Sequence, residues 1–259
     1  MKKLVVIITI LILFIPKVNA STSSASSYIL MDSTTGRVLM SKDMHSKRLI
    51  ASITKIMTAT LAIESGKLDD VVEVSPIIKE AYGSGIYIEV GEEITLKDLV
   101  YGLMLRSGND AAMMISEYIG GTTEEFVNMM NKKAKELGMK ETTFYNPSGL
   151  PTPSGNYSSA YDMALLTKYA MNSPVYQEIV KTKTYKVTTN KKTYLWHNKN
   201  KLLKYDYITG GKTGYTEESG RTLVSTANID NMPLIVVTIR DSDVCNTHIE
   251  IYNYAKDNY

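Results

Sequence analysis

The chain has few of the side chains that form covalent cross-links or bind metal ions. Its 259 residues include one cysteine, Cys245, and three histidines. A single cysteine excludes a disulfide scaffold, and a zinc site of the usual kind needs three or four clustered His and Cys ligands. We therefore expect no disulfide, no metal ion and no other cofactor, and we expect Cys245 to be a buried packing thiol.

The chain also lacks a large excess of charge of either sign. Lys and Arg together number 29 and Asp and Glu number 27, which gives a net charge of +2. Nucleic-acid-binding domains are typically basic, with Lys and Arg clustered on one face, so we expect no nucleic-acid partner. A content of 44% hydrophobic and 22% charged residues is ordinary for a globular protein.

The apolar run near the N-terminus, Leu4 to Ile15, is shorter than the about 20 residues that a membrane-spanning helix needs. Lys2 and Lys3 precede it and Val18-Asn19-Ala20 follows it, a pattern typical of a secretory signal. We predict cleavage after Ala20, so that residues 1–20 are a signal peptide and residues 21–259 form a single exported domain. The alternative is an uncleaved anchor.

Segments typical of strands lie near both ends of the chain, and segments typical of helices lie between them. The expected strands are 28–31, 37–41, 185–189, 192–196, 212–215, 222–227 and 234–239. The expected helices are 52–64, 95–106, 111–119, 123–137, 161–171 and 248–256. This order predicts an α+β protein, with an antiparallel sheet built from both chain ends and a helical insertion at about 70–180.

The first candidate for chemistry is Ser52-Ile53-Thr54-Lys55, a Ser-x-x-Lys sequence that occurs once. Side chains three residues apart share one face of a helix, so the hydroxyl and the amine are neighbours. A neutral Lys55 amine could take the proton of Ser52, but a free lysine titrates near 10.4, and a shift of about three units costs roughly 4 kcal/mol. Burial and a second cation would both favour it. The alternative is a helix-capping serine beside a solvated lysine.

Two further short motifs carry suitable groups. Lys212-Thr213-Gly214 opens an expected strand. Gly214 lets a ligand backbone approach the strand edge closely. Lys212 could be the second cation that lowers the pKa of Lys55, and Thr213 could bind a substrate carboxylate. Ser-Gly-Asn occurs twice. The copy at 154–156 lies among prolines and glycines and is typical of a turn. We favour the copy at 107–109, where Ser107 could relay a proton and Asn109 could hold a substrate carbonyl.

Taken together, the three motifs are far more specific than each alone. They follow one another in the order Ser-x-x-Lys, Ser-x-Asn, Lys-Thr-Gly, at intervals of 55 and 105 residues. A closely related set occurs in β-lactamases and penicillin-binding proteins. The sequence resembles the D-alanyl-D-alanine carboxypeptidases, the low-molecular-mass penicillin-binding proteins, over about residues 27–259. The resemblance includes the segments 51–58, 107–111, 146–150, 161–164 and 211–216.

This resemblance implies the serine β-lactamase/transpeptidase-like fold: a five-stranded antiparallel sheet flanked by helices, with a mostly helical lobe. It implies acyl transfer, in which Ser52 attacks the penultimate D-Ala of a peptidoglycan stem peptide, terminal D-Ala leaves and water hydrolyses the acyl-enzyme. β-Lactams would acylate Ser52 as substrate mimics. The role would lie in peptidoglycan synthesis and cell shape, in a secreted or cell-wall-associated protein.

The resemblance also implies a role for each residue of the motifs. Lys55 would be the general base, and Ser107 with Lys212 would carry a proton to the leaving amine. Asn109 would position the peptide and Thr213 would bind its terminal carboxylate beside Gly214. The N–H groups of Ser52 and Tyr215 would form an oxyanion hole, typically worth about 3–4 kcal/mol per donor.

The sequence departs from the family pattern in two places. The chain ends at Tyr259, 45 residues after Gly214, so we expect neither the C-terminal β-rich domain nor the amphipathic membrane anchor of many members. Many members also carry an arginine near the Lys-Thr-Gly strand that assists carboxylate binding. Arg221, Arg240 and His248 lie in the relevant region, and the sequence does not single one out.

Alternative functions stay open at this stage. A β-lactamase of the same fold would need a deacylating glutamate between the second and third motifs, and none of Glu141, Asp162, Glu178 and Asp206 lies in a Glu-x-x-x-Asn loop. A sensor would bind β-lactam or muropeptide without turnover. A Ser-His-Asp hydrolase is poorly supported because no Gly-x-Ser-x-Gly elbow occurs.

Overall fold

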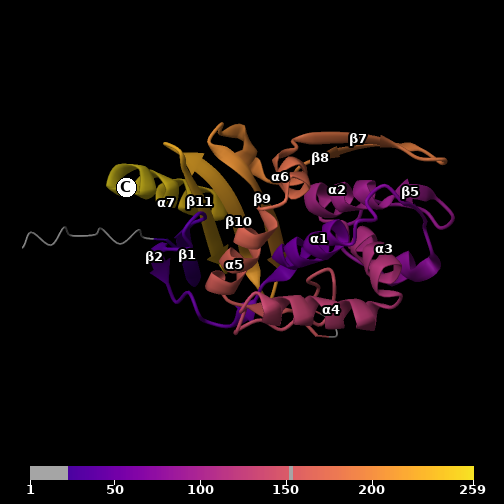
Figure 1. The fold of residues 1–259 in the computed structure, drawn as a ribbon, viewed down its shortest axis with the longest axis horizontal. Helices are drawn as coiled ribbons and strands as arrows, with labels where there is room; N and C mark the ends of the chain where they lie inside the picture. Colours follow the sequence, from indigo (N-terminus) through magenta and orange to yellow (C-terminus); the bar gives the residue numbers. More distant parts are fainter. Residues whose placement is uncertain (1–22, 152–153) are drawn as a thin grey trace, which may run out of the picture.

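The computed structural model describes residues 23–151 and 154–259 (Figure 1), so the expected signal peptide and its cleavage site lie outside the described residues. At the centre is a five-stranded sheet in the order β2-β1-β11-β10-β9, with every neighbouring pair antiparallel. Its strands are β1 (Ser27–Asp32), β2 (Val38–Lys42), β9 (Ile208–Thr216), β10 (Gly220–Ile229) and β11 (Met232–Ile239). The prediction of a sheet built from both chain ends is confirmed.

The sheet forms because its central strands are apolar on both faces. In β1, Ile29, Leu30 and Met31 are all fully buried, and β1 pairs with the Val- and Ile-rich β11 in the register Ile29 to Val237. Strands covered on both sides have this continuous apolar composition. The expected strands 28–31 and 37–41 pair as the β1–β2 hairpin, and the Asp32 carboxylate accepts the backbone N–H groups of its turn.

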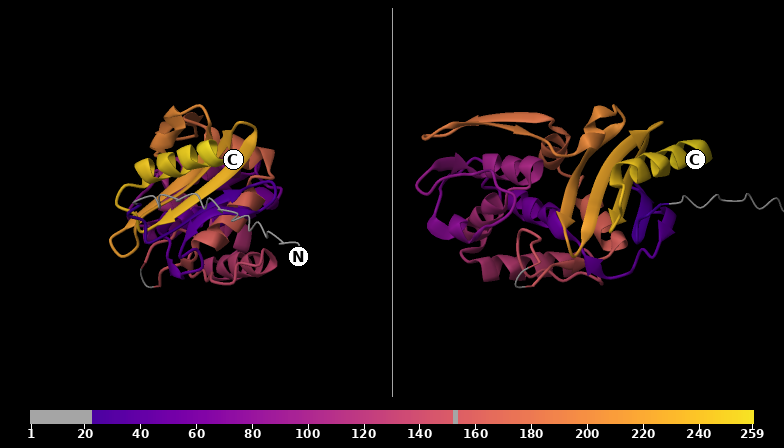
Figure 2. Two further views of the ribbon diagram at one scale, coloured as in Figure 1. Left: turned by 90° about the vertical axis from the view of Figure 1, so that its left-hand side faces the viewer. Right: turned by 180° about the vertical axis from the view of Figure 1, so that it is seen from behind.

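The helices divide between the two faces of the sheet and a lobe beside it (Figures 1 and 2). They are α1 (Lys55–Glu64), α2 (Leu96–Arg106), α3 (Asn109–Gly120), α4 (Thr123–Glu136), α5 (Ala160–Ala170), α6 (Pro174–Lys181) and α7 (Val244–Asn258). The C-terminal helix α7 covers one face, α5 covers the other, and α1 to α4 form the lobe. Apolar side chains accordingly gather in one cluster between α7 and the sheet and a larger one on the opposite face and in the lobe.

The helix boundaries are largely those predicted, and the differences have local causes. The predicted helix 52–64 begins as a 3-10 turn, η1 (Ala51–Thr54), and becomes α-helical only at Lys55. Helix α2 starts behind Thr95, close to the predicted start at 95, and the Thr95 hydroxyl caps it by accepting the backbone N–H of Asp98. Helix α6 was missed, although Ser173 as N-cap and Pro174 in the first turn are its start signals.

The strands β7 (Thr184–Thr188) and β8 (Thr193–His197) form a hairpin of their own, outside the central sheet. The hairpin runs along the lobe over α2 (Figure 1), and the rings of Tyr185 and Tyr101 stack with centroids 3.6 Å apart. The remaining short strands pair as β3 (Arg48–Leu49) with β6 (Tyr157–Ser158) and β4 (Val71–Glu73) with β5 (Glu93–Thr95). Two further 3-10 turns are η2 (Pro76–Glu80) and η3 (Lys201–Lys204).

Over residues 23–151 and 154–259, none of the helices combines the length and the apolar character that crossing a membrane requires.

Candidate active site

Ser52 lies in the 3-10 turn η1, and Lys55 is the first residue of α1. The Lys55 Nζ atom lies 3.1 Å from Ser52 Oγ, a hydrogen-bond distance. The turn is unusual in that Ala51 takes a left-handed backbone conformation, with φ of +48°. Such a conformation is costly for a residue other than glycine and is held by its surroundings. The local sequence and this turn together set the hydroxyl beside the amine.

Lys55 is fully buried, and no carboxylate within residues 23–151 and 154–259 is bonded to it. Its amine instead contacts three oxygen atoms: Ser52 Oγ, Asn109 Oδ1 at 2.7 Å and the carbonyl of Ser148 at 2.5 Å. Burial first, and then the positive charges of Lys212 and Lys199, hold the pKa of Lys55 well below its usual value. This is the direction that a general base requires, because only the neutral amine accepts a proton.

A second Ser–Lys pair faces the same site. Ser107 follows α2 in a left-handed conformation, with φ of +64°, and its Oγ lies 3.1 Å from the Nζ atom of Lys212 on β9. Lys212 is 1% exposed and also donates to the carbonyl of Thr213 at 2.6 Å. Burial, followed by the charge of Lys199, lowers the pKa of Lys212 to about 7. An amine with such a pKa exchanges protons readily near neutral pH.

Asn109, the first residue of α3, bonds both to Lys55 and to the loop that carries Tyr82 and Ser84. Its Oδ1 accepts from Lys55, and its Nδ2 donates to the carbonyl of Tyr82 at 2.6 Å. Its backbone N–H donates to the carbonyl of Ser84 at 2.7 Å. These bonds make Asn109 a positioning group for the Lys55 amine. Its expected contact with a substrate carbonyl stays a prediction.

Strand β9 passes very close to the turn that carries the nucleophile. A Cβ atom added to Gly214 would lie 2.9 Å from the backbone nitrogen of Ser52 and 2.4 Å from Thr222 Oγ1. Only a glycine allows this approach. Gly214 therefore lets the edge of β9 lie directly beside the Ser52 N–H group. The expected oxyanion hole from the Ser52 and Tyr215 N–H groups stays a prediction.

Two groups of the site were not predicted from the sequence. The Ser148 carbonyl, which accepts from Lys55, belongs to the recurring segment 146–150, but a backbone carbonyl leaves no mark in a sequence. Lys199 follows β8, donates to Ser84 Oγ at 3.1 Å and lowers the pKa of both Lys55 and Lys212. Its only signal was a basic stretch from 181 to 204 with no acidic residue, and such stretches are usually solvated.

Residues from all three motifs line one cleft of about 590 Å³. Ser52, Ser107, Thr213, Gly214 and Tyr215 line it, and its far end reaches Arg221 and the start of α7. The second Ser-Gly-Asn copy lies in the loop before β6, as predicted. There Asn156 accepts the backbone N–H groups of that loop and donates to Thr54 Oγ1. In the described part of the chain, no three His, Cys, Asp or Glu side chains are grouped as metal ligands.

Comparison with known proteins agrees with this geometry. A family model described as D-alanyl-D-alanine carboxypeptidase (Peptidase_S11) matches residues 16–243. The D-alanyl-D-alanine carboxypeptidase DacF of Bacillus subtilis is 44% identical over 224 residues, which cover 82% of this chain and 56% of that protein. DacC of Escherichia coli is 36% identical over 238 residues, which cover 86% of this chain and 58% of that protein. The chain thus spans a little over half the length of these relatives.

Solved structures show the same fold. A variant of the Streptomyces K15 DD-transpeptidase superposes with a TM-score of 0.84 at 29% identity, covering 90% of this chain and 99% of that one. The carboxypeptidase DacD of Francisella tularensis superposes with a TM-score of 0.81 at 31% identity, covering 87% and 68%. The predicted serine β-lactamase/transpeptidase-like fold is confirmed. The two Ser–Lys pairs and this fold agree with the family model, which matches most of the chain. The chain belongs to the D-alanyl-D-alanine carboxypeptidase family, peptidase S11.

Proposed function

We propose that this protein is a serine D-Ala-D-Ala carboxypeptidase, which removes the terminal D-alanine from peptidoglycan stem peptides. The observation that carries the proposal is the meeting of two Ser–Lys pairs at one cleft, with the amine beside Ser52 fully buried. Such a pair is a nucleophile with its base, and the second pair can serve the leaving group. The names of the family and of its relatives supply the substrate class.

The acylation step follows from these contacts. Ser52 Oγ attacks the carbonyl carbon of the penultimate D-Ala while its proton passes to the neutral Lys55 amine, 3.1 Å away. The negative oxygen of the tetrahedral intermediate lies against the N–H groups of Ser52 and Tyr215. The C–N bond then breaks, and the leaving nitrogen takes a proton from Ser107, which is replenished by the Lys212 ammonium at 3.1 Å.

Deacylation returns the enzyme to its starting state. By proton exchange with solvent, the Lys55 ammonium first loses the proton it took from Ser52 and Lys212 regains the one it gave up. A water molecule then attacks the ester carbonyl and passes a proton to the neutral Lys55 amine. The bond to Ser52 Oγ breaks, Lys55 returns that proton to the serine, and the shortened peptide leaves as a carboxylic acid. Thr213 lies in the same cleft and is suited to bind the terminal carboxylate of the incoming peptide. A β-lactam presents a similar carbonyl and carboxylate, so it acylates Ser52 as well.

The substrate implies an extracytoplasmic place of action, since peptidoglycan lies outside the cytoplasmic membrane. The N-terminal pattern of two lysines and an apolar run is consistent with export. We assign a role in cell-wall synthesis on this basis.

The test combines intact-protein mass spectrometry after penicillin treatment, peptide mapping, and an assay of D-Ala release from a diacyl tripeptide ending in D-Ala-D-Ala. We expect a long-lived adduct on Ser52 and release of D-Ala. We expect Ser52→Ala to abolish both while the thermal unfolding temperature is kept. An unlabelled Ser52, or full activity of the variant, contradicts the proposal. Rapid penicillin turnover would instead indicate a β-lactamase, and an adduct without D-Ala release would indicate a sensor.

A further inference from the structure

A second, smaller hollow adjoins the cleft and is not used by the proposed chemistry. Its volume is about 190 Å³, and its lining includes Tyr82, Gly83, Ser84, Tyr87 and Asp110. Ser84 lines both hollows, so the two adjoin at this residue. Tyr82 is 51% and Tyr87 71% exposed, which places two aromatic side chains in solvent at the mouth of the site. Exposed aromatic groups beside a cleft are typical of binding surfaces.

The backbone under Tyr87 is held in an unfavourable conformation. Its φ of +62° is left-handed, which is uncommon for a bulky residue and persists only where the surroundings enforce it. The Asp110 carboxylate accepts the N–H groups of Ile86 and Tyr87 at 3.0 and 2.7 Å. On the other side, Lys192 Nζ and the Tyr194 hydroxyl donate to the Tyr87 carbonyl at 2.9 and 3.2 Å.

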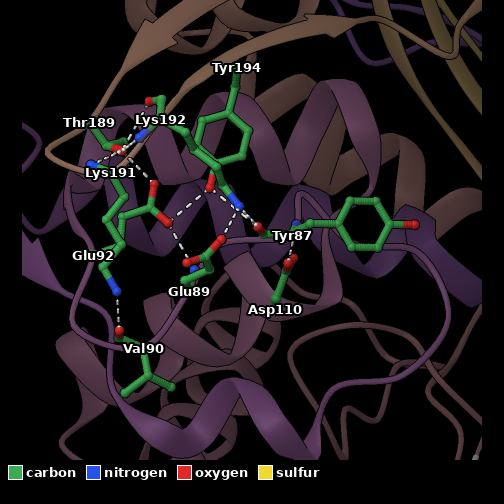
Figure 3. Close-up of polar contacts among 9 residues, drawn as sticks. All are labelled: Tyr87, Glu89, Val90, Glu92, Asp110, Thr189, Lys191, Lys192 and Tyr194. Atoms are coloured by element: carbon green, nitrogen blue, oxygen red, sulfur yellow. Dashed lines mark hydrogen bonds and ion pairs between the residues drawn. The ribbon is translucent and has the colours of Figure 1, made fainter.

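The β7–β8 hairpin makes further hydrogen bonds to the loop that carries Tyr87 (Figure 3). The carboxylate of Glu92, itself fully buried, accepts from the hydroxyls of Thr189 and Tyr194 at 2.6 and 2.9 Å. Lys191 Nζ donates to the Val90 carbonyl at 2.5 Å. The loop is therefore bonded to α3 on one side and to the hairpin on the other, and the ring of Tyr87 points away from the bonded cluster (Figure 3). The fold therefore holds the Tyr87 ring in an exposed position.

Tyr82 lies close to the nucleophile along a short chain of contacts. Its carbonyl accepts from Asn109 at 2.6 Å, Asn109 accepts from Lys55 at 2.7 Å, and Lys55 contacts Ser52 at 3.1 Å. A stem peptide spans about 3.4 Å per residue when extended, so the few residues between its scissile bond and its sugar cover about 10–15 Å. A stem peptide bound at Ser52 is therefore long enough for its sugar to reach these rings.

We propose that Tyr82 and Tyr87 form a subsite for a sugar ring of the glycan strand to which the stem peptide is attached. A pyranose ring has an apolar C–H face that packs on an aromatic ring, and the hydroxyl of a tyrosine stays available to bond the polar rim of the sugar. This subsite rests on the proposed function, because it names the part of the same substrate that lies beyond the peptide.

The test compares two substrates that differ only in the sugar: a disaccharide-linked pentapeptide and the free pentapeptide, both ending in D-Ala-D-Ala. Tyr87→Gly removes the ring and suits the left-handed backbone, and Tyr87→Phe keeps the ring. Tyr259→Ala is a control, since Tyr259 is 55% exposed but lies in the C-terminal segment. We expect Tyr87→Gly to raise KM for the sugar-bearing substrate about tenfold, and Tyr87→Phe to raise it much less, because this variant loses only the hydroxyl and keeps the ring.

The free pentapeptide and penicillin acylation should be unaffected in all three variants. Equal losses on both substrates would overturn the subsite, because the ring would then serve the peptide or the fold. No loss on either substrate would overturn it too. If the wild-type protein releases D-Ala from neither substrate, the proposed function fails, and the subsite fails with it. Activity on the free peptide with no effect of Tyr87→Gly refutes the subsite alone.

Discussion

Lys55 is the residue on which the proposed chemistry most depends, since its amine is the only base in contact with Ser52 Oγ among the described residues. We predict that Lys55→Ala lowers the rate of penicillin acylation by about 10²–10⁴-fold, the usual contribution of a general base. Stopped-flow or gel-based labelling measures this rate. The thermal unfolding temperature is measured alongside, because the Asn109 and Ser148 oxygens lose their buried donor in this variant. An acylation rate within the range of the wild-type protein would contradict the assignment.

Lys199 acts on the site through its charge. It lowers the pKa of Lys55, so the Lys55 amine loses its proton at a lower pH than it would alone. Below the pKa of Lys55 the amine is charged and acylation slows. Replacing Lys199 with methionine removes one of the cations, raises the pKa of Lys55 and moves the acid limb of the pH–acylation profile to higher pH.

Lys201 provides the matched control for this experiment, because it lines the same cleft but is not among the charges that lower the pKa of Lys55. Lys201→Met should leave the acid limb in place. A profile of Lys199→Met that coincides with that of the wild-type protein, or that moves to lower pH, would show that Lys199 does not tune the base.

At the scale of elements, α7 is attached to the sheet through a buried polar cluster. His248 on α7 is fully buried, with Nδ1 2.6 Å from Ser225 Oγ on β10 and Nε2 3.1 Å from Thr238 Oγ1 on β11. The hydroxyl of Tyr252 lies 2.8 Å from the same Ser225 Oγ. Burial lowers the pKa of His248 from 6.5 to about 3, so the folded protein keeps this imidazole neutral.

This shift makes folding depend on pH. Between about pH 3 and 6.5 the unfolded chain binds a proton at His248 that the folded chain does not, so stability falls as the pH falls. Above about pH 6.5 the imidazole is neutral in both states, and the folded protein has its full stability with respect to this group. Between about pH 3 and 6.5, His248 alone changes the unfolding free energy by about 1.4 kcal/mol per pH unit. We predict that His248→Gln flattens the pH dependence of urea unfolding over this range. A variant with the wild-type slope would contradict the prediction.

At the scale of the whole molecule, the hairpin β7–β8 joins the later part of the chain to the loop 82–92, which carries one wall of the site. Glu92 supplies the buried carboxylate between the loop and the hairpin. Its loss removes the acceptor of the Thr189 and Tyr194 hydroxyls and of the backbone N–H of Glu89. We predict that Glu92→Ala destabilises the protein by about 1–3 kcal/mol, the usual result when buried groups lose their acceptor.

The same variant should also slow penicillin acylation, because the loop holds Asn109 through the carbonyls of Tyr82 and Ser84. Glu93→Ala is the matched control, since the neighbouring Glu93 is exposed and its side chain can be removed without touching the joint. Denaturant unfolding and labelling rates measure both effects. Equal behaviour of the two variants would show that the joint does not support the site.

The sequence predicted those parts of the fold that depend on local pattern. Thr95 and the apolar spacing behind it predicted the start of α2, and the Val-rich segment 234–239 predicted the sheet strand β11. It did not predict that 51–54 forms a 3-10 turn, because the left-handed Ala51 is imposed by packing, including the approach of Gly149 to the Ala51 carbonyl. Helix α6 is short, and its eight residues carry too little periodicity to stand out.

The spacing of Ser52 and Lys55 by itself predicted that these two side chains are neighbours, because residues three apart in a helical segment lie on the same face. The order of the three motifs likewise pointed to one family. The tertiary structure decided the rest: that the Lys55 amine lies wholly out of water, that Lys199 joins Lys212 as a nearby cation, and that Ser148 supplies a carbonyl. A pKa and a binding surface sum contributions from groups far apart in the chain, and only folding brings those groups together.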